Sequence, residues 1–361
     1  MESRLDRLSG AGFAEAFSSR SELAALALAE RNAAAGGSRD RGVRPPFASV
    51  SGYAAGLAGR AVCLTLLAGS GSRWVKSLAA AESRGEGRGF DPAKPRGLYP
   101  VRDFLAGAKR PDRRIPVAAY ALAAVRGLGR HLVVVRGWEA EIDDEILGPL
   151  GIGPGDRDFF TQAAPFGKPL GHGDAAWQCR ELLEGADYAV TNFGGDANSR
   201  RTILSSLLAL DALRASGKAV DLIIPAAPID FPAYPIGLDA EGLPRTFGHA
   251  KLQGREAATR GLGYTNVGVR VYYAPALVER LESFRSRYWV EDTGYAIPGN
   301  DPEGHEFALD NVDAELAREG RARILAIARP EELTPAKSVD DVPAFERAVE
   351  SVVAEDAELR R

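Results

Sequence analysis

The sequence is poor in cysteine, histidine and methionine, on which several functional classes depend. It has 2 cysteines, 4 histidines and 1 methionine among 361 residues. Two cysteines cannot form a disulfide framework or a cysteine zinc site, and Cys63 lies within an apolar run. Isolated thiols of this kind are typical of a reducing compartment, so we expect a cytoplasmic protein.

The sequence also lacks an excess of positive charge and any long apolar run. Lys and Arg number 45 against 49 Asp and Glu, which gives a net charge of −4. Without a basic field, we expect no binding to nucleic acid. Nowhere do about 18 uncharged apolar residues follow one another, and the opening MESRLDRLSG has no apolar core. We therefore expect neither a membrane-spanning helix nor a secretion signal.

Several catalytic signatures are missing as well. Residues 69–74, GSGSRW, lack the Gly-Lys-Ser/Thr that ends a P-loop, and Trp74 stands where a dinucleotide fingerprint needs its third glycine. There is no G-x-S-x-G elbow and no H-E-x-x-H pair. These absences disfavour a P-loop nucleotidase, a Rossmann dehydrogenase, an elbow-type serine hydrolase and a zinc peptidase of that kind.

What is present is an apolar run that stops in glycines. Residues 61–68 read AVCLTLLA, the pattern of a buried parallel strand, and the turn 69–72 is followed by Arg73. Glycine allows backbone N–H groups to approach an anion, and a guanidinium can chelate phosphate oxygens. The pattern therefore indicates a phosphate-binding turn, although a plain Gly-Ser turn would look the same.

Strands and helices are expected to alternate along the rest of the chain. The expected strands cover 131–135, 159–162, 187–193, 219–226, 266–273 and 323–329, and the expected helices cover 114–128, 174–183, 201–215, 276–287 and 342–359. Such alternation predicts an α/β protein with a mostly parallel sheet and with ligands at the carboxyl ends of its strands. Residues 74–89 have little periodicity and are expected to form a surface loop. We expect a helical N-terminal segment over 1–50, an α/β domain over 51–345 and a C-terminal helix over 346–361.

Six short pieces of this sequence occur in an order that points to one family. They are Gly-Ser-Gly-Ser-Arg at 69–73, Pro-Arg-Gly-Leu-Tyr at 95–99, Gly-His-Gly-Asp at 171–174 preceded by Gln162, Asn192 followed by Asp196, Phe-Ala-Leu-Asp at 307–310, and Glu-Glu-Leu-Thr-Pro-Ala-Lys-Ser at 331–338. From about residue 61 to 345 the chain resembles the nucleotidyltransferases (sugar-1-phosphate pyrophosphorylases). More narrowly, it resembles the eukaryotic-type UTP-dependent uridylyltransferases that include the UDP-N-acetylhexosamine pyrophosphorylases.

The resemblance implies a three-layer α/β/α fold of the nucleotide-diphospho-sugar transferase (GT-A-like, Rossmann-related) type with a mixed sheet. It also implies a Mg²⁺-dependent reaction in which UTP and a sugar 1-phosphate give a UDP-sugar and pyrophosphate. This sequence departs from the family in two places. Arg96 replaces the family's lysine, with Lys94 just before it, and about twenty residues separate Arg73 from Pro95 where the family has only a few.

Roles for individual residues follow from the same resemblance. The implied nucleotide-binding residues are Leu67, Ala68, Gly69, Ser70, Gly71, Ser72, Gln162, Gly171, His172 and Gly173. The implied catalytic cations are Arg73, Lys94, Arg96 and Lys337, the sugar-binding residue is Asn266, and the Mg²⁺ ligands are Asp196 and Asp310. The two carboxylates are the minimum that Mg²⁺ requires beside phosphate oxygens. We expect His172 to be structural, because a sugar phosphate is already ionised near pH 7.

Several alternatives stay open at this point. Asp196 and Asp310 could each serve only as a helix cap or turn residue. The chain could be a catalytically inactive nucleotide- or nucleotide-sugar-binding protein on the same fold, or a nucleotidyltransferase that uses another nucleoside triphosphate. The identity of the sugar and the oligomeric state do not follow from the sequence.

Overall fold

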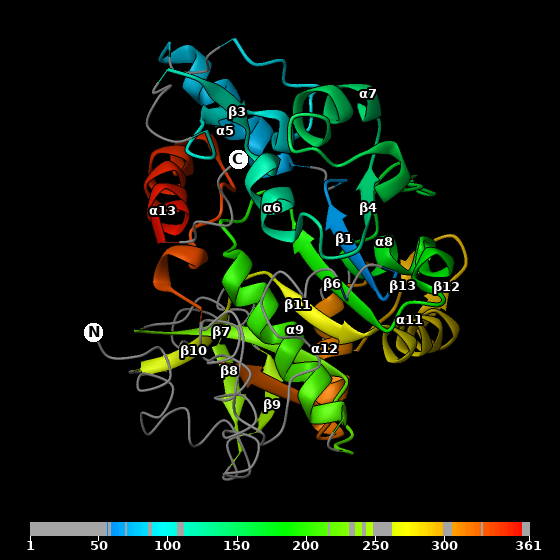
Figure 1. Ribbon diagram of the computed structural model, residues 1–361. Coiled ribbons are helices and arrows are strands. Elements are labelled where there is room, and N and C mark those ends of the chain that lie inside the picture. Colours follow the sequence, from blue (N-terminus) through cyan, green and yellow to red (C-terminus); the bar gives the residue numbers. More distant parts are fainter. Residues whose placement is uncertain are drawn as a thin grey trace.

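Figure 1 shows the computed structural model of the chain. It describes residues 56, 59–68, 71–85, 89–106, 112–215, 217–230, 235–239, 243–247, 262–298, 305–325 and 328–355. The expected helical segment 1–50 and the turn residues Gly69 and Ser70 lie outside these residues. Within the described part of the chain, no helix is both long and apolar enough to cross a bilayer.

The apolar run after residue 60 forms the central strand of a parallel block. β1 (Ala61–Leu66) lies between β4 (Arg130–Val135) and β6 (Tyr188–Phe193) and is parallel to both, and β5 (Arg157–Thr161) extends the block beyond β4. Thr65 is in register with Val133 on one side and Asn192 on the other. The strand order reverses between β1 and β6, and ligands of open α/β sheets bind at such a reversal.

The other half of the ten-stranded sheet is mixed. β11 (Arg270–Tyr273) is antiparallel to both β6 and β7 (Leu222–Asp230), and β14 (Ala322–Leu325) is parallel to β7 along its other edge. β10 (Leu262–Asn266) pairs with the distal part of β7, and β8 (Pro235–Leu238) and β9 (Pro244–Phe247) follow it. Because β11 is antiparallel, its first residue lies at the edge where the parallel strands end.

Helices cover both faces of the sheet, so the protein has three layers (Figure 1). α6 (Ala118–Val125) and α9 (Arg200–Ala215) pack together on one face, while α8 (His172–Gln178), α11 (Ala274–Tyr288) and α12 (Leu309–Arg318) pack together on the other. α5 (Ser72–Ser83) and α13 (Val342–Glu355) both contact the short helix η7 (Val339–Asp341). Every residue of α6 is buried, which explains its uniformly apolar sequence.

Short elements complete the fold. They are the strands β2 (Pro100–Arg102), β3 (Arg114–Pro116), β12 (Trp289–Val290) and β13 (Gly294–Tyr295), and the one-turn helices α7 (Glu139–Ile142), η1 (Arg96–Leu98), η2 (Asp143–Leu147), η3 (Pro154–Asp156), η4 (Arg180–Leu183) and η6 (Pro330–Leu333). The mixed α/β architecture predicted from the sequence is confirmed.

Three expectations about individual elements were wrong. Residues 74–89 were expected to form a loop, but α5 covers most of them, with Trp74, Leu78 and Ala81 buried at helical spacing. The expected helix 114–128 begins as strand β3, and its helical part starts at Ala118. The expected strand 266–273 is interrupted at Gly268, whose φ of +83° an L residue rarely adopts. Apart from these three elements, the residues on either side of the expected boundary between 345 and 346 both belong to α13.

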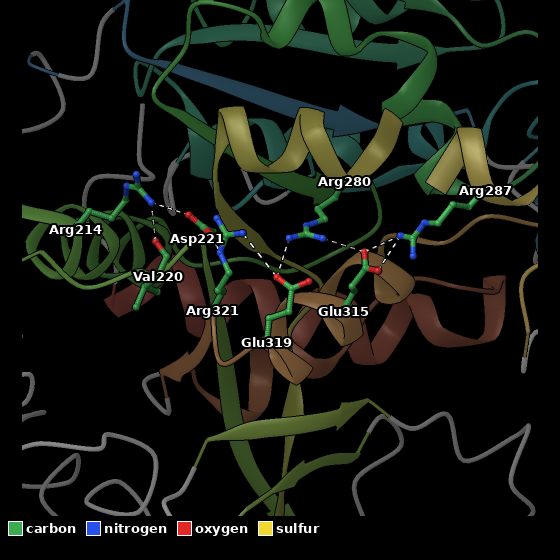
Figure 2. A network of polar contacts seen from close by, with 8 residues as sticks. All are labelled: Arg214, Val220, Asp221, Arg280, Arg287, Glu315, Glu319 and Arg321. Carbon is green, nitrogen blue, oxygen red and sulfur yellow. Dashed lines mark hydrogen bonds and ion pairs between the residues drawn. The ribbon is translucent and has the colours of Figure 1, made fainter. Parts of the chain in front are cut away.

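A chain of alternating charges fixes α12 against its neighbours (Figure 2). It runs through Arg214, Asp221, Arg321, Glu319, Arg280, Glu315 and Arg287. Arg280 and Arg287 point from α11 toward α12, where Arg280 lies 2.7 Å from Glu319 and Arg287 lies 2.7 Å from Glu315. Networks of this kind restrain a helix more than isolated pairs do. The restraint matters because the first turn of α12 carries Asp310.

Candidate functional site

A cavity of about 820 Å³ opens where the strand order of the sheet reverses. Its walls come from the ends of β1 and β6, the start of β11, and loops and helix ends from other parts of the chain. The residues expected from the sequence that line it are Leu67, Ala68, Gly71, Arg73, Arg96, Gln162, Gly171, His172, Asp196, Asn266, Asp310 and Lys337. Gly173 is buried behind the wall, Lys94 lines a neighbouring cavity, and Ser72 begins α5.

The Gly-His-Gly-Asp turn is packed against a distant segment of the chain. Gly171 has φ +93° and ψ 173°, and a Cβ on it would overlap the backbone of Phe307. A Cβ on Gly173 would lie 2.9 Å from the Phe307 ring. The Gly173 N–H donates to the Phe307 carbonyl at 2.8 Å, and the Phe307 N–H donates to the Leu170 carbonyl at 2.8 Å. The two glycines therefore allow residues 170–173 and 307–310 to meet.

This contact places His172 beside Asp310. The Leu309 N–H donates to His172 Nδ1 at 3.0 Å, so the ring proton is on Nε2, which lies 3.4 Å from Asp310 Oδ2. Burial lowers the pKa of His172 to about 4, against the opposing effect of Asp310. The imidazole is thus neutral at pH 7, and both of its nitrogens are engaged, Nδ1 as an acceptor and Nε2 toward Asp310, so neither is free to act as a base. This geometry suits a structural role for His172, which stays a prediction.

Sequence reasoning missed Arg270, a buried cation in the wall of the cavity. Its side chain is only 4% exposed, and it donates to Asp310 Oδ1 at 2.8 Å and to Asp313 Oδ2 at 2.6 Å. The Tyr272 hydroxyl donates to the other oxygen of Asp313 at 2.5 Å. Although burial acts in the opposite direction, Arg270 and His172 together hold the pKa of Asp310 below its usual value. A lone arginine inside the apolar run VGVRVYY was the signal that could have identified it.

Asp196 follows β6 and faces the same cavity. One of its carboxylate oxygens lies against Gly268, where any Cβ would overlap it. Within the described residues its side chain has neither a hydrogen bond nor an ion pair. Burial raises the pKa of Asp196 to about 6, and the nearby cations Arg96, Lys337 and Arg270 offset only part of this effect. Asp196 is therefore a carboxylate whose charge is incompletely compensated.

The donor set fits Mg²⁺ only together with a phosphorylated ligand. No cluster of three or more His, Cys, Asp or Glu side chains that could hold a metal occurs among the described residues. Mg²⁺, however, is commonly bound by one or two carboxylates plus substrate phosphates. Asp196 supplies a free carboxylate, and Asp310 supplies a second one that is held in place by Arg270. The two residues named from the sequence therefore suit a metal that is shared with a nucleotide.

Two arginines of the cavity have no acceptor among the residues that the structure describes. The guanidinium of Arg96 lies over Gly195. A Cβ placed on that glycine would be 2.9 Å from Arg96 Nη2. Arg73 is exposed in the first turn of α5. Neither side chain has a hydrogen bond or ion pair with any residue that the structure describes. Burial lowers the pKa of Arg96, an effect that the carboxylate of Asp196 opposes. Both cations are thus available to an anionic ligand.

Lys337 reaches the cavity through a second long-range contact. The Ala336 N–H donates to the Gly195 carbonyl at 2.9 Å, which joins the segment 331–338 to the loop of Asp196. Buried Glu332 reinforces this contact from the base of the loop. Its carboxylate accepts from the Ser199 N–H at 3.0 Å and from the Thr202 hydroxyl at 2.9 Å, at the start of α9.

The side-chain amides of Gln162 and Asn266 each have one group bonded within the described part of the chain and one group that is left for a ligand. Gln162 is buried and its Nε2 donates to the Gly171 carbonyl at 3.3 Å, which leaves its carbonyl oxygen as an acceptor. Asn266 Oδ1 accepts from the Gly268 N–H at 3.2 Å, which leaves its amide N–H₂ as a donor. Gln162 and Asn266 come from opposite halves of the sheet.

The structure separates the two cations that the sequence left with one shared role. Arg96 lines the large cavity beside Asp196. Lys94 lines only the neighbouring cavity, where its Nζ lies 5.4 Å from the centre of the Trp138 ring. Arg96 is therefore the one of the two that faces Asp196.

The chain matches no protein-family model, and no curated protein matches it either.

Proposed function

We propose that this protein is a Mg²⁺-dependent nucleotidyltransferase that makes a UDP-sugar and pyrophosphate from UTP and a sugar 1-phosphate. The observation that carries the proposal is the convergence of residues from all six sequence pieces on one cavity, although they are spread over positions 69–338. Its volume of about 820 Å³ lies in the range of cavities that bury a ligand of nucleotide size. Its position at the strand reversal is where open α/β sheets bind nucleotides.

The charge of the cavity supports transfer of a nucleotidyl group. Arg73, Arg96 and Lys337 line it from three separate segments, and cations so placed neutralise the charge that develops on phosphate oxygens. The sugar phosphate oxygen would attack the α-phosphorus in line, and the pyrophosphate would leave on the opposite side. Asp196 and Asp310 would hold Mg²⁺, which supplies further charge neutralisation on the phosphates when bound. Alignment, rather than proton transfer, is the chief requirement.

The uracil base is supported by the orientation of Gln162. Because its amide nitrogen is already donating to the Gly171 carbonyl, the remaining group is an acceptor. An acceptor there suits a base with a ring N–H on its pairing edge, such as uracil, and not cytosine or adenine, whose corresponding ring nitrogen is itself an acceptor. This argument favours UTP over CTP and ATP.

The sugar phosphate would occupy the opposite end of the cavity. Asn266 lines the cavity and offers its amide N–H₂ there. Such a donor suits a hydroxyl group of a hexose or an N-acetylhexosamine. We also propose the GT-A-like form of the α/β fold and a cytoplasmic location. The latter rests on the two free, buried cysteines, which suit a reducing compartment.

One observation favours the alternative of a nucleotide-binding protein without activity. Asp310 is already ion-paired with Arg270, so its carboxylate is less available to Mg²⁺ than an unpaired carboxylate would be. A protein of that kind would bind UTP or a UDP-sugar in the same cavity and release no pyrophosphate.

A pyrophosphate-release assay over four nucleoside triphosphates and a panel of sugar 1-phosphates tests the proposal. We expect release with UTP and one hexose or N-acetylhexosamine phosphate, falling by about 100-fold or more in Asp196→Asn. Asp340→Asn is the matched control, because Asp340 is exposed and pairs with Arg84 outside the cavity. If calorimetry shows that UTP binds but no pair of substrates releases pyrophosphate, the protein is a nucleotide-binding protein and not an enzyme. Release with CTP alone would overturn the reading of Gln162.

A further inference from the structure

The carboxylate of Asp174 is buried behind the wall of the large cavity. Asp174 stands in the first turn of α8, is 1% exposed and does not belong to the cavity lining. A buried carboxylate is costly unless its oxygens accept hydrogen bonds. The Tyr295 hydroxyl donates to Oδ1 at 2.9 Å, and the Gln178 amide donates to Oδ2 at 2.6 Å. Both oxygens therefore act as acceptors, as in an ionised carboxylate.

A cation held between aromatic rings lies beside this carboxylate. The Arg285 guanidinium lies 3.2 Å from the centre of the Trp289 ring and 4.2 Å from the centre of the Trp177 ring. Its Nη1 is 3.9 Å from Asp174 Oδ1 and donates to the Tyr295 hydroxyl at 3.4 Å. Burial raises the pKa of Asp174, and its hydrogen bonds and the charge of Arg285 oppose that rise. These surroundings favour the ionised form.

The same carboxylate is linked to the segment that carries Gln162. The Gln178 amide that donates to Asp174 also donates to the Ala163 carbonyl at 3.3 Å, and the Gln178 side-chain oxygen accepts from the Ala163 N–H at 2.8 Å. On the other side, the backbone N–H of Gln162 donates to the Val135 carbonyl at 2.8 Å. The backbone here is thus fixed by β4 and α8, and only the side-chain amide of Gln162 can still adopt two orientations.

The two orientations differ in which end of the amide faces the cavity. Gln162 Nε2 donates to the Gly171 carbonyl at 3.3 Å. The Gln162 amide also donates to the Asp174 carboxylate, where it opposes the effect of burial on the pKa of that group. A carbonyl and an ionised carboxylate only accept hydrogen bonds, so both require the N–H₂ end. In the reverse orientation, the amide oxygen would face two acceptors.

From these contacts we infer that Asp174 is a positioning residue for base selectivity, whose carboxylate holds the Gln162 amide so that its oxygen faces the nucleotide base. The inference rests on the proposed function and deepens it, because it names the residue on which a preference for uracil over cytosine depends. Uracil presents a ring N–H to that oxygen, whereas cytosine presents a ring nitrogen that is itself an acceptor. A residue with a structural role alone would affect the binding of both bases alike.

Calorimetric titration of the full chain with UTP and with CTP tests this assignment. We expect the wild-type chain to bind UTP at least about tenfold more tightly than CTP, because two acceptors that face each other are both left unpaired. Asp174→Asn has one oxygen for three donors, so the Gln162 amide loses its fixed orientation. The ratio of the two affinities should then fall to about threefold or less.

Gln178→Met is the matched variant, because it removes a partner of the same carboxylate but leaves the carboxylate in place. It also releases the backbone of Ala163, so it should weaken the binding of UTP and CTP by a similar factor. The ratio of the two affinities should stay at the wild-type value. A ratio that falls equally in Asp174→Asn and Gln178→Met would reduce Asp174 to a structural residue and overturn the inference.

Hydrogen exchange in the wild-type chain keeps the inference falsifiable if Asp174→Asn does not fold. The side-chain N–H₂ of Gln162 can be assigned in nitrogen-15 spectra by its loss in Gln162→Met. It should exchange slowly even without a nucleotide, since its partners belong to the protein. Protection that begins only when UTP binds would mean that the N–H₂ faces the base, and the inference would fail.

The outcomes separate this inference from the proposed function. A ratio that falls only in Asp174→Asn, in a chain that releases no pyrophosphate, would uphold the role of Asp174 and remove the enzyme. Pyrophosphate release from UTP in a chain whose Asp174→Asn variant keeps the wild-type ratio would remove the role of Asp174 alone. If the wild-type chain binds neither nucleotide, both proposals fall.

Discussion

Substituting Gly171 with alanine tests how the cavity is assembled. If the glycine serves the contact with Phe307, a methyl group should destabilise the whole protein and not only its complex with a nucleotide. Phe307 cannot yield easily, because it is fully buried and its ring is stacked on Phe284 with 5.0 Å between centres. The new Cβ would also stand against the Phe307 backbone, with 3.1 Å to its carbonyl carbon.

The expected loss is the sum of two effects. The backbone of Gly171, at φ +93° and ψ 173°, lies in a region that is essentially restricted to glycine, which costs an alanine about 1–3 kcal/mol. Overpacking against Phe307 costs about 1–3 kcal/mol more. We therefore expect Gly171→Ala to lower the free energy of unfolding by roughly 2–6 kcal/mol, measured by urea denaturation. Binding of UTP should weaken as well, since His172 and Asp310 meet through the same contact.

Gly167→Ala is the matched control for backbone strain. Gly167 has φ +72° in the same connection between β5 and α8, but nothing lies within 4 Å of the position of its Cβ. Its substitution should cost only about 1–2 kcal/mol from the left-handed conformation. If the two variants unfold with the same free energy, the close contact with Phe307 does not contribute to stability and the account of the turn fails.

Three further variants test other parts of the structure. Glu332→Ala should lower the free energy of unfolding by about 3 kcal/mol, because buried donors at the start of α9 lose their acceptor; a loss below about 1 kcal/mol in urea denaturation would contradict this. Arg96→Ala should raise the pKa of Asp196 above about 6, since the guanidinium lowers it, and carbon-13 NMR of the carboxyl group would reveal an unchanged pKa if the contact is absent. His131 is buried with a pKa lowered to about 4, against 6.5 when unfolded, so the unfolded chain binds more protons between these values and stability falls as the pH drops from about 6.5 to 4. His131→Leu should remove up to about 3 kcal/mol of that decline; denaturation curves at pH 7 and 4.5 that change equally in both proteins would exclude the effect.

Much of the parallel half of the sheet could be predicted because its strands are continuous apolar runs. β1, β4 and β6 read as buried strands, and the turns that follow them carry the polar residues that ligands require. The helix α5 was missed although its apolar residues Trp74, Leu78 and Ala81 lie on one face. Apart from the exposed Val75, its remaining positions are small or charged, so the apolar stripe is narrow and the signal is weak.

The partners of the predicted site residues could not be found from the sequence, because they are set by long-range packing. Asp310 was identified from a short motif, but the pairing of that motif with His172 depends on backbone hydrogen bonds across more than a hundred positions. Arg270 lies on β11 and Asp310 on α12, with α11 and two short strands between them in the chain, so the 2.8 Å contact between the two depends on tertiary packing. Sequence patterns thus indicate which side chains carry chemistry, while the contacts that orient them emerge only from the fold.

The separation of Lys94 from Arg96 illustrates the same limit at short range. In an extended segment, residues two positions apart lie on the same side of the chain. Lys94 and Arg96 would then point toward the same target. Pro95 is extended, with φ −63° and ψ 144°, but the helix η1 begins at Arg96 and turns the chain there. The change of conformation between neighbouring residues sends one cation toward Asp196 and the other toward Trp138. The sequence motif around Pro95 therefore predicts that a cation is needed there. The turn that begins at Arg96 decides which of the two cations faces Asp196.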